Sequence, residues 1–90
     1  MKEALGLIEV RGLSTAILTA DTMSKASNIS VLEIENAKGG GYMAIKIKGD
    51  VAAVNAAISA GKSIAAQHGS FIASKVIARP SDDLSGMFIK

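Results

Sequence analysis

Apolar residues recur along this chain with two different spacings, and the changes in spacing predict its secondary structure. Residues 3–10 are apolar at most positions on both faces, which is typical of a strand covered on both sides. Residues 13–27 change to apolar positions three or four apart, which predicts an amphipathic helix with Ser14 as N-cap and Asn28 at its end. The apolar stripe of this helix consists of Leu13, Ala16, Ile17, Ala20 and Met23.

The middle of the chain has the patterns of two strands, over residues 29–36 and 42–48. In the second strand, large apolar side chains alternate with other residues, so the two sets lie on opposite faces. The faces consist of Met43, Ile45 and Ile47 on one side and Tyr42, Ala44, Lys46 and Lys48 on the other. Because a short Lys-Gly-Gly-Gly loop at 38–41 joins the two segments, we expect an antiparallel hairpin.

The second half of the chain predicts a helix followed by a strand. Asp50 is the expected N-cap, because its carboxylate can accept from exposed amides, and Gly69 after His68 is a favourable helix-ending residue. The apolar stripe of this helix consists of Val51, Val54, Ile58, Gly61 and Ala65. A fourth strand is predicted at 70–77, and one short helical turn at 81–90.

The predicted order is β-α-β-β-α-β, the split βαβ arrangement of the ferredoxin-like folds. The fold class is therefore α+β, with one antiparallel four-stranded sheet and both helices on a single face. Two helices leave the other face open. Apolar residues on that face would need a cover, and a neighbouring subunit is the simplest one.

Composition narrows the class of protein. Ninety residues make one domain, and the absence of cysteine excludes disulfides and thiolate metal sites. No apolar run approaches the ~20 residues that span a bilayer, so we expect a soluble, intracellular protein without a membrane partner. The net charge is +2, but only Lys46 and Lys48 lie close together, so nucleic-acid binding is not expected.

The sequence contains no recognisable catalytic set. His68, the only histidine, is interpreted as a surface or cap residue, and Glu33 and Glu35 as a solvated strand face. Neither an enzyme activity nor a cofactor or metal is predicted. The three glycines at 39–41 indicate either flexibility or exposed backbone amides. A phosphate-binding loop is disfavoured, because a strand rather than a helix follows them.

Four blocks of sequence resemble the shell proteins of bacterial microcompartments. They are residues 3–13, 20–26, 48–54 and 76–80, they occur in the family's order, and they are distributed from residue 3 to residue 80. The strongest resemblance is to the single-domain, hexamer-forming shell proteins of carboxysomes and of propanediol- and ethanolamine-utilising compartments. The chain is accordingly identified as one shell domain over residues 1–90.

This resemblance implies a flat homohexamer that packs edge to edge with other hexamers and other shell proteins. It implies a shell in the bacterial cytoplasm around enzymes, which attach through short targeting peptides, and a central pore for small polar metabolites. By correspondence with the family, the pore residues are Lys38, Gly39, Gly40 and Gly41. The hexamer–hexamer edge residues are Lys25, Asn28 and Arg79.

Some positions depart from the family pattern. Lys38 stands where an apolar residue is common, Ala78 where proline is common, and Ser81 where histidine is common. The stretch 28–39 is about one residue longer than usual. If Lys38 points at the pore, anions are favoured; if it points away, which we expect because like charges repel, the glycines define a nearly neutral opening.

Two other functions are compatible with the same secondary-structure order. One is a small-molecule-sensing oligomeric regulatory domain of ferredoxin-like fold, which would form dimers or trimers rather than hexamers. The other is a small enzyme, which is the weakest of the three because the catalytic residues are missing.

Overall fold

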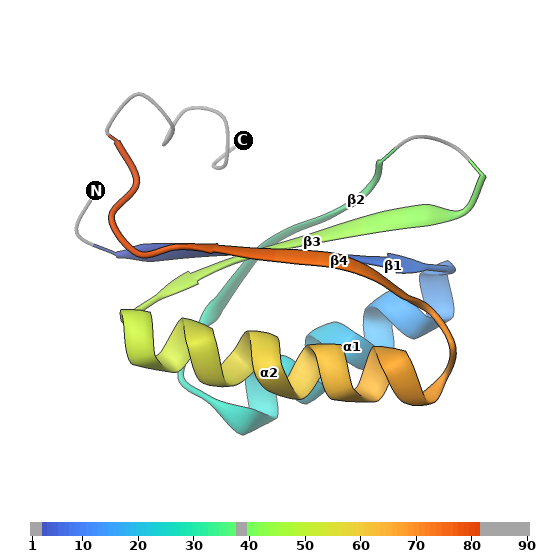
Figure 1. Ribbon diagram of the computed structural model, residues 1–90, viewed down its shortest axis with the longest axis horizontal. Coiled ribbons are helices and arrows are strands. Elements are labelled where there is room, and N and C mark those ends of the chain that lie inside the picture. The colour runs from blue at the N-terminus through green and yellow to red at the C-terminus, as the bar shows by residue number, and fades with distance from the viewer. Residues whose placement is uncertain (1–2, 38–39, 82–90) are drawn as a thin grey trace.

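The computed structural model describes residues 3–37 and 40–81, and these form a four-stranded sheet with two helices (Figure 1). The elements are β1 (Ala4–Arg11), α1 (Leu13–Ala26), β2 (Ser30–Asn36), β3 (Tyr42–Gly49), α2 (Val51–Gln67) and β4 (Phe71–Ile77). The βαββαβ order predicted from the sequence is confirmed. The helical turn expected at 81–90 is not shown, because residues 82–90 lie outside the described residues and Ser81 is not helical.

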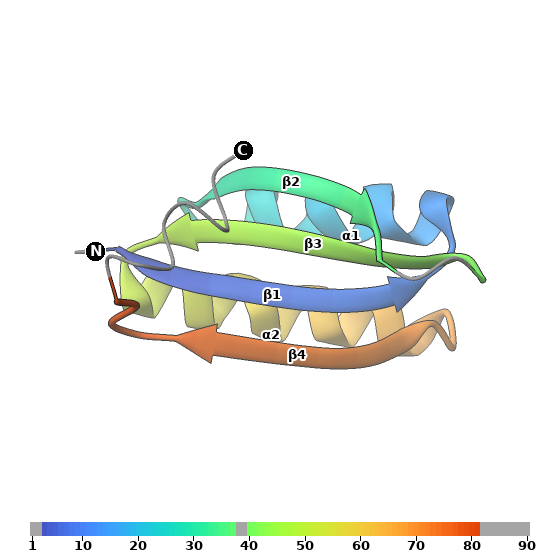
Figure 2. The ribbon, with the colours of Figure 1, turned by 90° about the horizontal axis from the view of Figure 1, so that it is seen from above.

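The strands lie in the order β2-β3-β1-β4, and all neighbours are antiparallel. Both helices pack against the same face of the sheet, and Figure 2 shows the strands from the side that the helices leave open. The two central strands pair without a break from Ala4 with Gly49 to Arg11 with Tyr42. The α+β architecture predicted from the hydrophobic pattern is therefore confirmed.

Each edge strand contains one irregularity. Leu32 is the extra residue in β2, between Val31 and Glu33, and Ile72 is the extra residue in β4. Such bulges accept one residue more in a strand while the ladder continues on both sides. The bulge in β2 lies within the stretch 28–39, where the sequence appeared one residue long.

The core lies between the sheet and the helices and is built almost entirely from aliphatic side chains. It consists of Ala4, Ile8, Val10, Ala16, Ala20, Met23, Met43, Ile45, Ile47, Val54, Ala57, Ile58 and Ala65. Two glycines permit close approach. A Cβ on Gly6 of β1 would lie 2.9 Å from Val54 Cγ1 of α2, and one on Gly61 of α2 would lie 2.8 Å from Met23 Cγ of α1. Helix α2 thus packs tightly against both β1 and α1.

The range predicted for α1 was correct to within one residue, but its predicted capping residues were wrong. The N-cap is Gly12 with φ 93°, a left-handed conformation that favours glycine, and its carbonyl accepts from Ala16 N at 3.0 Å. Ser14 lies inside the helix rather than before it. Helix α1 ends at Ala26 through an extended Ser27, so Asn28 is not the left-handed cap that the sequence predicted.

The predicted limits of α2 were correct. Asp50 Oδ2 accepts from Ala52 N at 3.3 Å, as expected of an N-cap. At the other end Gly69 has φ 64°, Gly69 N donates to Ala66 O, and Ser70 N donates to Ala65 O. This pair of hydrogen bonds is the Schellman motif, in which glycine supplies the left-handed residue.

The apolar stripe predicted for α1 was too wide. The buried residues of α1 are Ala16, Thr19, Ala20 and Met23, whereas Leu13 and Ile17 are 58% and 55% exposed. Both exposed residues lie at one margin of the stripe, beyond the reach of the sheet and α2. On α2 the predicted stripe is buried except for its first member, Val51, which is exposed.

Candidate functional site

The loop between β2 and β3 ends in two glycines that adopt left-handed conformations. Gly40 has φ 62° and Gly41 has φ 83°, a region that other residues rarely occupy. The hairpin is closed by Ala37 N, which donates to Tyr42 O at 2.9 Å. The predicted pore residues Lys38 and Gly39 lie outside the described residues, so the geometry of the loop is given by Gly40 and Gly41.

Both described glycines of this loop have open space where a side chain would be. Nothing lies within 4 Å of a Cβ built on Gly41, and the nearest atom to one on Gly40 is Tyr42 Cε2 at 3.9 Å. Glycine is therefore required here by backbone conformation rather than by crowding. At Gly40 and Gly41 the chain presents backbone rather than side chains to its surroundings.

The other predicted site residues lie at the opposite end of the sheet. Strand pairing aligns Ser30, Lys48, Leu5 and Ile77 in one row across all four strands. Asn28 lies two residues before β2 begins, and Arg79 lies two residues after β4 ends, so both lie beyond this row. The row formed by Arg11 and Tyr42, next to the glycine loop, lies at the far end. The structure thus separates Gly40 and Gly41 from two of the predicted edge residues by the length of the sheet.

The dimensions of the chain match this separation. Its principal extents are 33 × 26 × 16 Å, so it is long and thin. Helix α1 begins directly after β1 at the loop end, and Lys25 is in its last turn, toward the other end (Figure 2). Lys25, Asn28 and Arg79 are all exposed.

Lys25 forms an ion pair within its own helix. Its Nζ lies 2.8 Å from Asp21 Oδ2, one turn earlier. The hydrogen bond and the charge of Asp21 raise the pKa of Lys25 above its usual range. Both side chains remain mostly exposed, so the amine stays accessible to a second partner.

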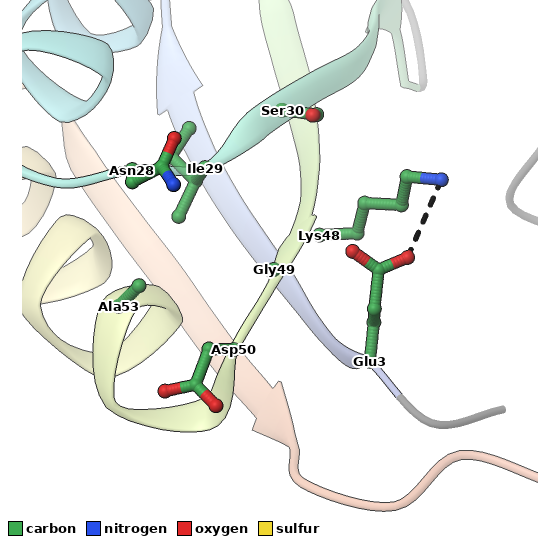
Figure 3. A pocket seen from close by; sticks show the side chains of 8 residues that line it. All are labelled: Glu3, Asn28, Ile29, Ser30, Lys48, Gly49, Asp50 and Ala53. Atoms are coloured by element: carbon green, nitrogen blue, oxygen red, sulfur yellow. Dashed lines mark ion pairs between the residues drawn. The ribbon is translucent and has the colours of Figure 1, made fainter.

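Asn28 lines a polar hollow of about 370 Å³ at the same end of the sheet (Figure 3). Its lining residues are Glu3, Asn28, Ile29, Ser30, Lys48, Gly49, Asp50 and Ala53. The charges inside it already have partners: Lys48 Nζ lies 3.5 Å from Glu3 Oε1, and Asp50 caps α2. Sequence reasoning missed this hollow, because its walls come from segments that are far apart in the chain.

On the open face of the sheet, Lys46 lies between two carboxylates of β2. Its Nζ is 2.7 Å from Glu35 Oε1 and 3.2 Å from Glu33 Oε1, and its side chain is only 13% exposed. The hydrogen bond to Glu35 raises the pKa of Lys46, Glu33 adds to this effect, and burial opposes it. The solvated strand face predicted from the sequence is therefore a partly buried ion-pair cluster.

His68 is exposed at the C-cap of α2, in agreement with the surface or cap residue that the sequence indicates. Within residues 3–37 and 40–81, no group of three or more potential metal ligands occurs. In the same part of the chain, no helix is both long and apolar enough to span a membrane.

Comparison with known proteins gives a consistent family. The BMC domain matches residues 4–80. The chain is 52% identical over 84 residues to the bacterial microcompartment shell protein PduK of Citrobacter freundii, covering 93% of this chain and 54% of PduK. It is 41% identical over 86 residues to the shell protein EutM of Escherichia coli K12, covering 96% of this chain and 88% of EutM.

A solved structure has the same fold. The crystal structure of a microcompartment protein from Desulfitobacterium hafniense superposes with a TM-score of 0.83 at 32% identity, over 93% of this chain and 45% of that chain. The chain thus spans about half the length of PduK and of this structural relative, and most of the length of EutM.

Proposed function

The chain belongs to the BMC domain family of bacterial microcompartment shell proteins, and we propose that six copies form a cyclic hexamer that tiles into a shell. In this proposal the loop at 38–41 lines a central pore for small polar metabolites. Lys25, Asn28 and Arg79 contact the next hexamer or another shell protein. The tile is structural rather than catalytic and lies in the bacterial cytoplasm, around enzymes that attach through short targeting peptides.

The observation that carries this proposal is the separation of the two sets of residues along a thin chain. A tile needs one end at the symmetry axis and the other at the rim. The glycine loop and the exposed residues Asn28 and Arg79 lie beyond opposite ends of the sheet, and the chain is only 16 Å thick. This arrangement supports a radial orientation in which the loop faces the axis.

The exposed backbone at Gly40 and Gly41 supports passage of polar solutes. Amide groups without neighbouring side chains can replace part of the hydration shell of a polar or anionic metabolite. If Lys38 also faces the opening, its charge would favour anions, although charges on an exposed rim are screened beyond about 8 Å at physiological salt.

The comparisons do not favour the alternative of a small-molecule-sensing regulatory domain. The two assemblies differ in symmetry, which makes them separable by electron microscopy of the purified protein. Flat sheets or tubes of six-fold tiles would support the shell function. Isolated dimers or trimers would contradict it.

The pore itself can be tested with Gly40→Asn. Asparagine tolerates the left-handed conformation better than most residues, so the variant adds six side chains at the axis with limited backbone strain. We expect a reduced flux of small polar solutes through assembled shells. Gly69→Asn is the matched control, because Gly69 has φ 64° and open space but lies outside the loop. Equal flux through shells of both variants and of the wild type would contradict an opening at this loop.

A further inference from the structure

Arg11 and Tyr42 form a cross-strand pair next to the glycine loop. Arg11 is the last residue of β1, Tyr42 is the first of β3, and the two are register partners. The guanidinium carbon of Arg11 lies 5.6 Å from the centroid of the Tyr42 ring. This is within the range of a cation–π contact, and the planar guanidinium is well suited to it.

The backbone next to this pair ties the loop to the rest of the sheet. Gly12 N donates to Gly41 O at 2.7 Å, and Arg11 N donates to Ser70 O at 2.9 Å. Two successive residues at the end of β1 therefore hold the glycine loop on one side and the start of β4 on the other. The left-handed conformation of Gly12 allows this amide to point at the loop while the chain turns into α1.

The Tyr42 ring also lies close to Gly40 in the loop. Its Cε2 atom is the nearest atom to a Cβ built on Gly40, at 3.9 Å. The ring is thus near both the guanidinium of Arg11 and the position that a Cβ on Gly40 would take. Movement of the ring changes the space beside Gly40, whereas the backbone of a loop rich in glycine has little stiffness of its own.

We infer that Arg11 is a positioning residue for the proposed opening: by holding the Tyr42 ring and the adjacent Gly12–Gly41 hydrogen bond, it fixes the direction in which the loop leaves the sheet. The inference rests on the proposed function, because it gives the loop a task at the axis. It assigns Arg11 a mechanical role that depends on stacking with the ring and differs from that of a generic surface cation.

Hydrogen exchange of the purified assembly tests the contact between Arg11 and Tyr42, here called the clamp, without any transport assay. Arg11→Gln and Tyr42→Leu remove it from either side, while Tyr42→Phe keeps the ring face. We expect the first two to speed amide exchange at Gly12 and Ala37 about two- to fivefold, the size of an exposed cation–π contact. Exchange at Val54, which donates to Asp50 O inside α2, should stay unchanged in all variants.

A matched charge control separates stacking from charge. Lys75 is exposed and pairs with Leu7 on the same open face, away from Tyr42, so Lys75→Gln removes an equivalent cation. The inference requires exchange in Lys75→Gln and Tyr42→Phe to match the wild type. The inference would be overturned if amide exchange became faster in Lys75→Gln, or if it did not become faster in Arg11→Gln.

Solute flux through assembled shells then links the clamp to the opening. We expect Arg11→Gln and Tyr42→Leu to change flux in the same direction and Lys75→Gln to leave it unchanged. If Gly40→Asn alters flux and Arg11→Gln does not, the opening stands and the role of Arg11 is overturned. If Gly40→Asn has no effect, the proposed pore fails, and the role of Arg11 in it fails as well.

Discussion

The two faces of the sheet shield their side chains by different means. Toward the helices, Ile8, Ile45 and Ile47 are fully buried among other aliphatic groups. On the open face, Lys46 is nearly as well shielded, but by ion pairs with Glu33 and Glu35. The helix-covered face specifies the fold by shape. The open face combines these charges with apolar residues such as Leu7, the register partner of Lys46, which suits a surface that adjoins water or another subunit.

The largest effect is expected where the helix-covered face is tightest. Gly6→Val places its Cβ 2.8 Å from Ile47 Cγ1 and 2.9 Å from Val54 Cγ1, so α2 must move away from the sheet. We expect a loss of about 3 kcal/mol in the free energy of unfolding, measured by urea denaturation. Ala73→Val, at an exposed position of β4, is the control and should change it little. A loss below about 1 kcal/mol for Gly6→Val would mean that this face tolerates overpacking.

A smaller effect is expected on the open face. Lys46→Met keeps most of the aliphatic stem but leaves Glu33 and Glu35 without their shared cation. We expect a loss of about 1–2 kcal/mol in the free energy of unfolding, because both carboxylates are only partly exposed. Lys75→Met removes an exposed cation from the same face and should be close to neutral.

The pH dependence of the stability difference between the wild type and Lys46→Met identifies its cause. Because the pKa of Lys46 is raised in the folded state, its contribution is fully present below the unfolded-state value of about 10.4 and is lost as the pH rises through the folded-state value. The stability gap between the wild type and Lys46→Met should therefore be constant from about pH 7 to about pH 9 and shrink above about pH 10. A stability gap that persists unchanged at high pH would show that the charge of Lys46 is not its cause.

The order and type of the elements could be predicted because the hydrophobic period changes clearly between them. The limits of α2 followed from Asp50 and Gly69, which cap it through ordinary local hydrogen bonds. The caps of α1 were not predicted correctly, because Gly12 begins the helix through its backbone conformation while the better N-cap residue, Ser14, lies inside it. Local chemistry alone does not decide between two such neighbours.

Some features of the candidate sites could likewise be predicted from the sequence, and others could not. That the loop and the residues after β4 lie at opposite ends of the sheet follows from the antiparallel order alone. The pairing of Arg11 with Tyr42 requires the exact register of β1 and β3, and the hollow beside Asn28 requires the packing of separate segments. The bulge at Leu32 likewise depends on tertiary contacts, since nothing in the residues around it marks an irregular strand.

The smallest effect on folding is expected at Lys25, where neither face of the sheet is involved. Lys25 is exposed, and its ion-pair partner Asp21 lies one turn earlier in the same helix, so Lys25→Ala should leave the melting temperature and the proposed hexamer unchanged. Sheet formation should nevertheless be lost, because a lysine stem can lie along a neighbouring surface while its amine reaches a carbonyl there.

Two controls give this last experiment its meaning. Lys62→Ala removes an exposed lysine from α2 and should still form sheets in electron micrographs. Asp21→Asn frees Lys25 from its intrahelical partner and should also form sheets, because the amine that contacts the neighbour is retained. Normal sheets from Lys25→Ala would remove Lys25 from the edge. Loss of sheets in Asp21→Asn would instead assign the effect to the Asp21–Lys25 pair, and so to the shape of the helix end rather than to a contact between tiles.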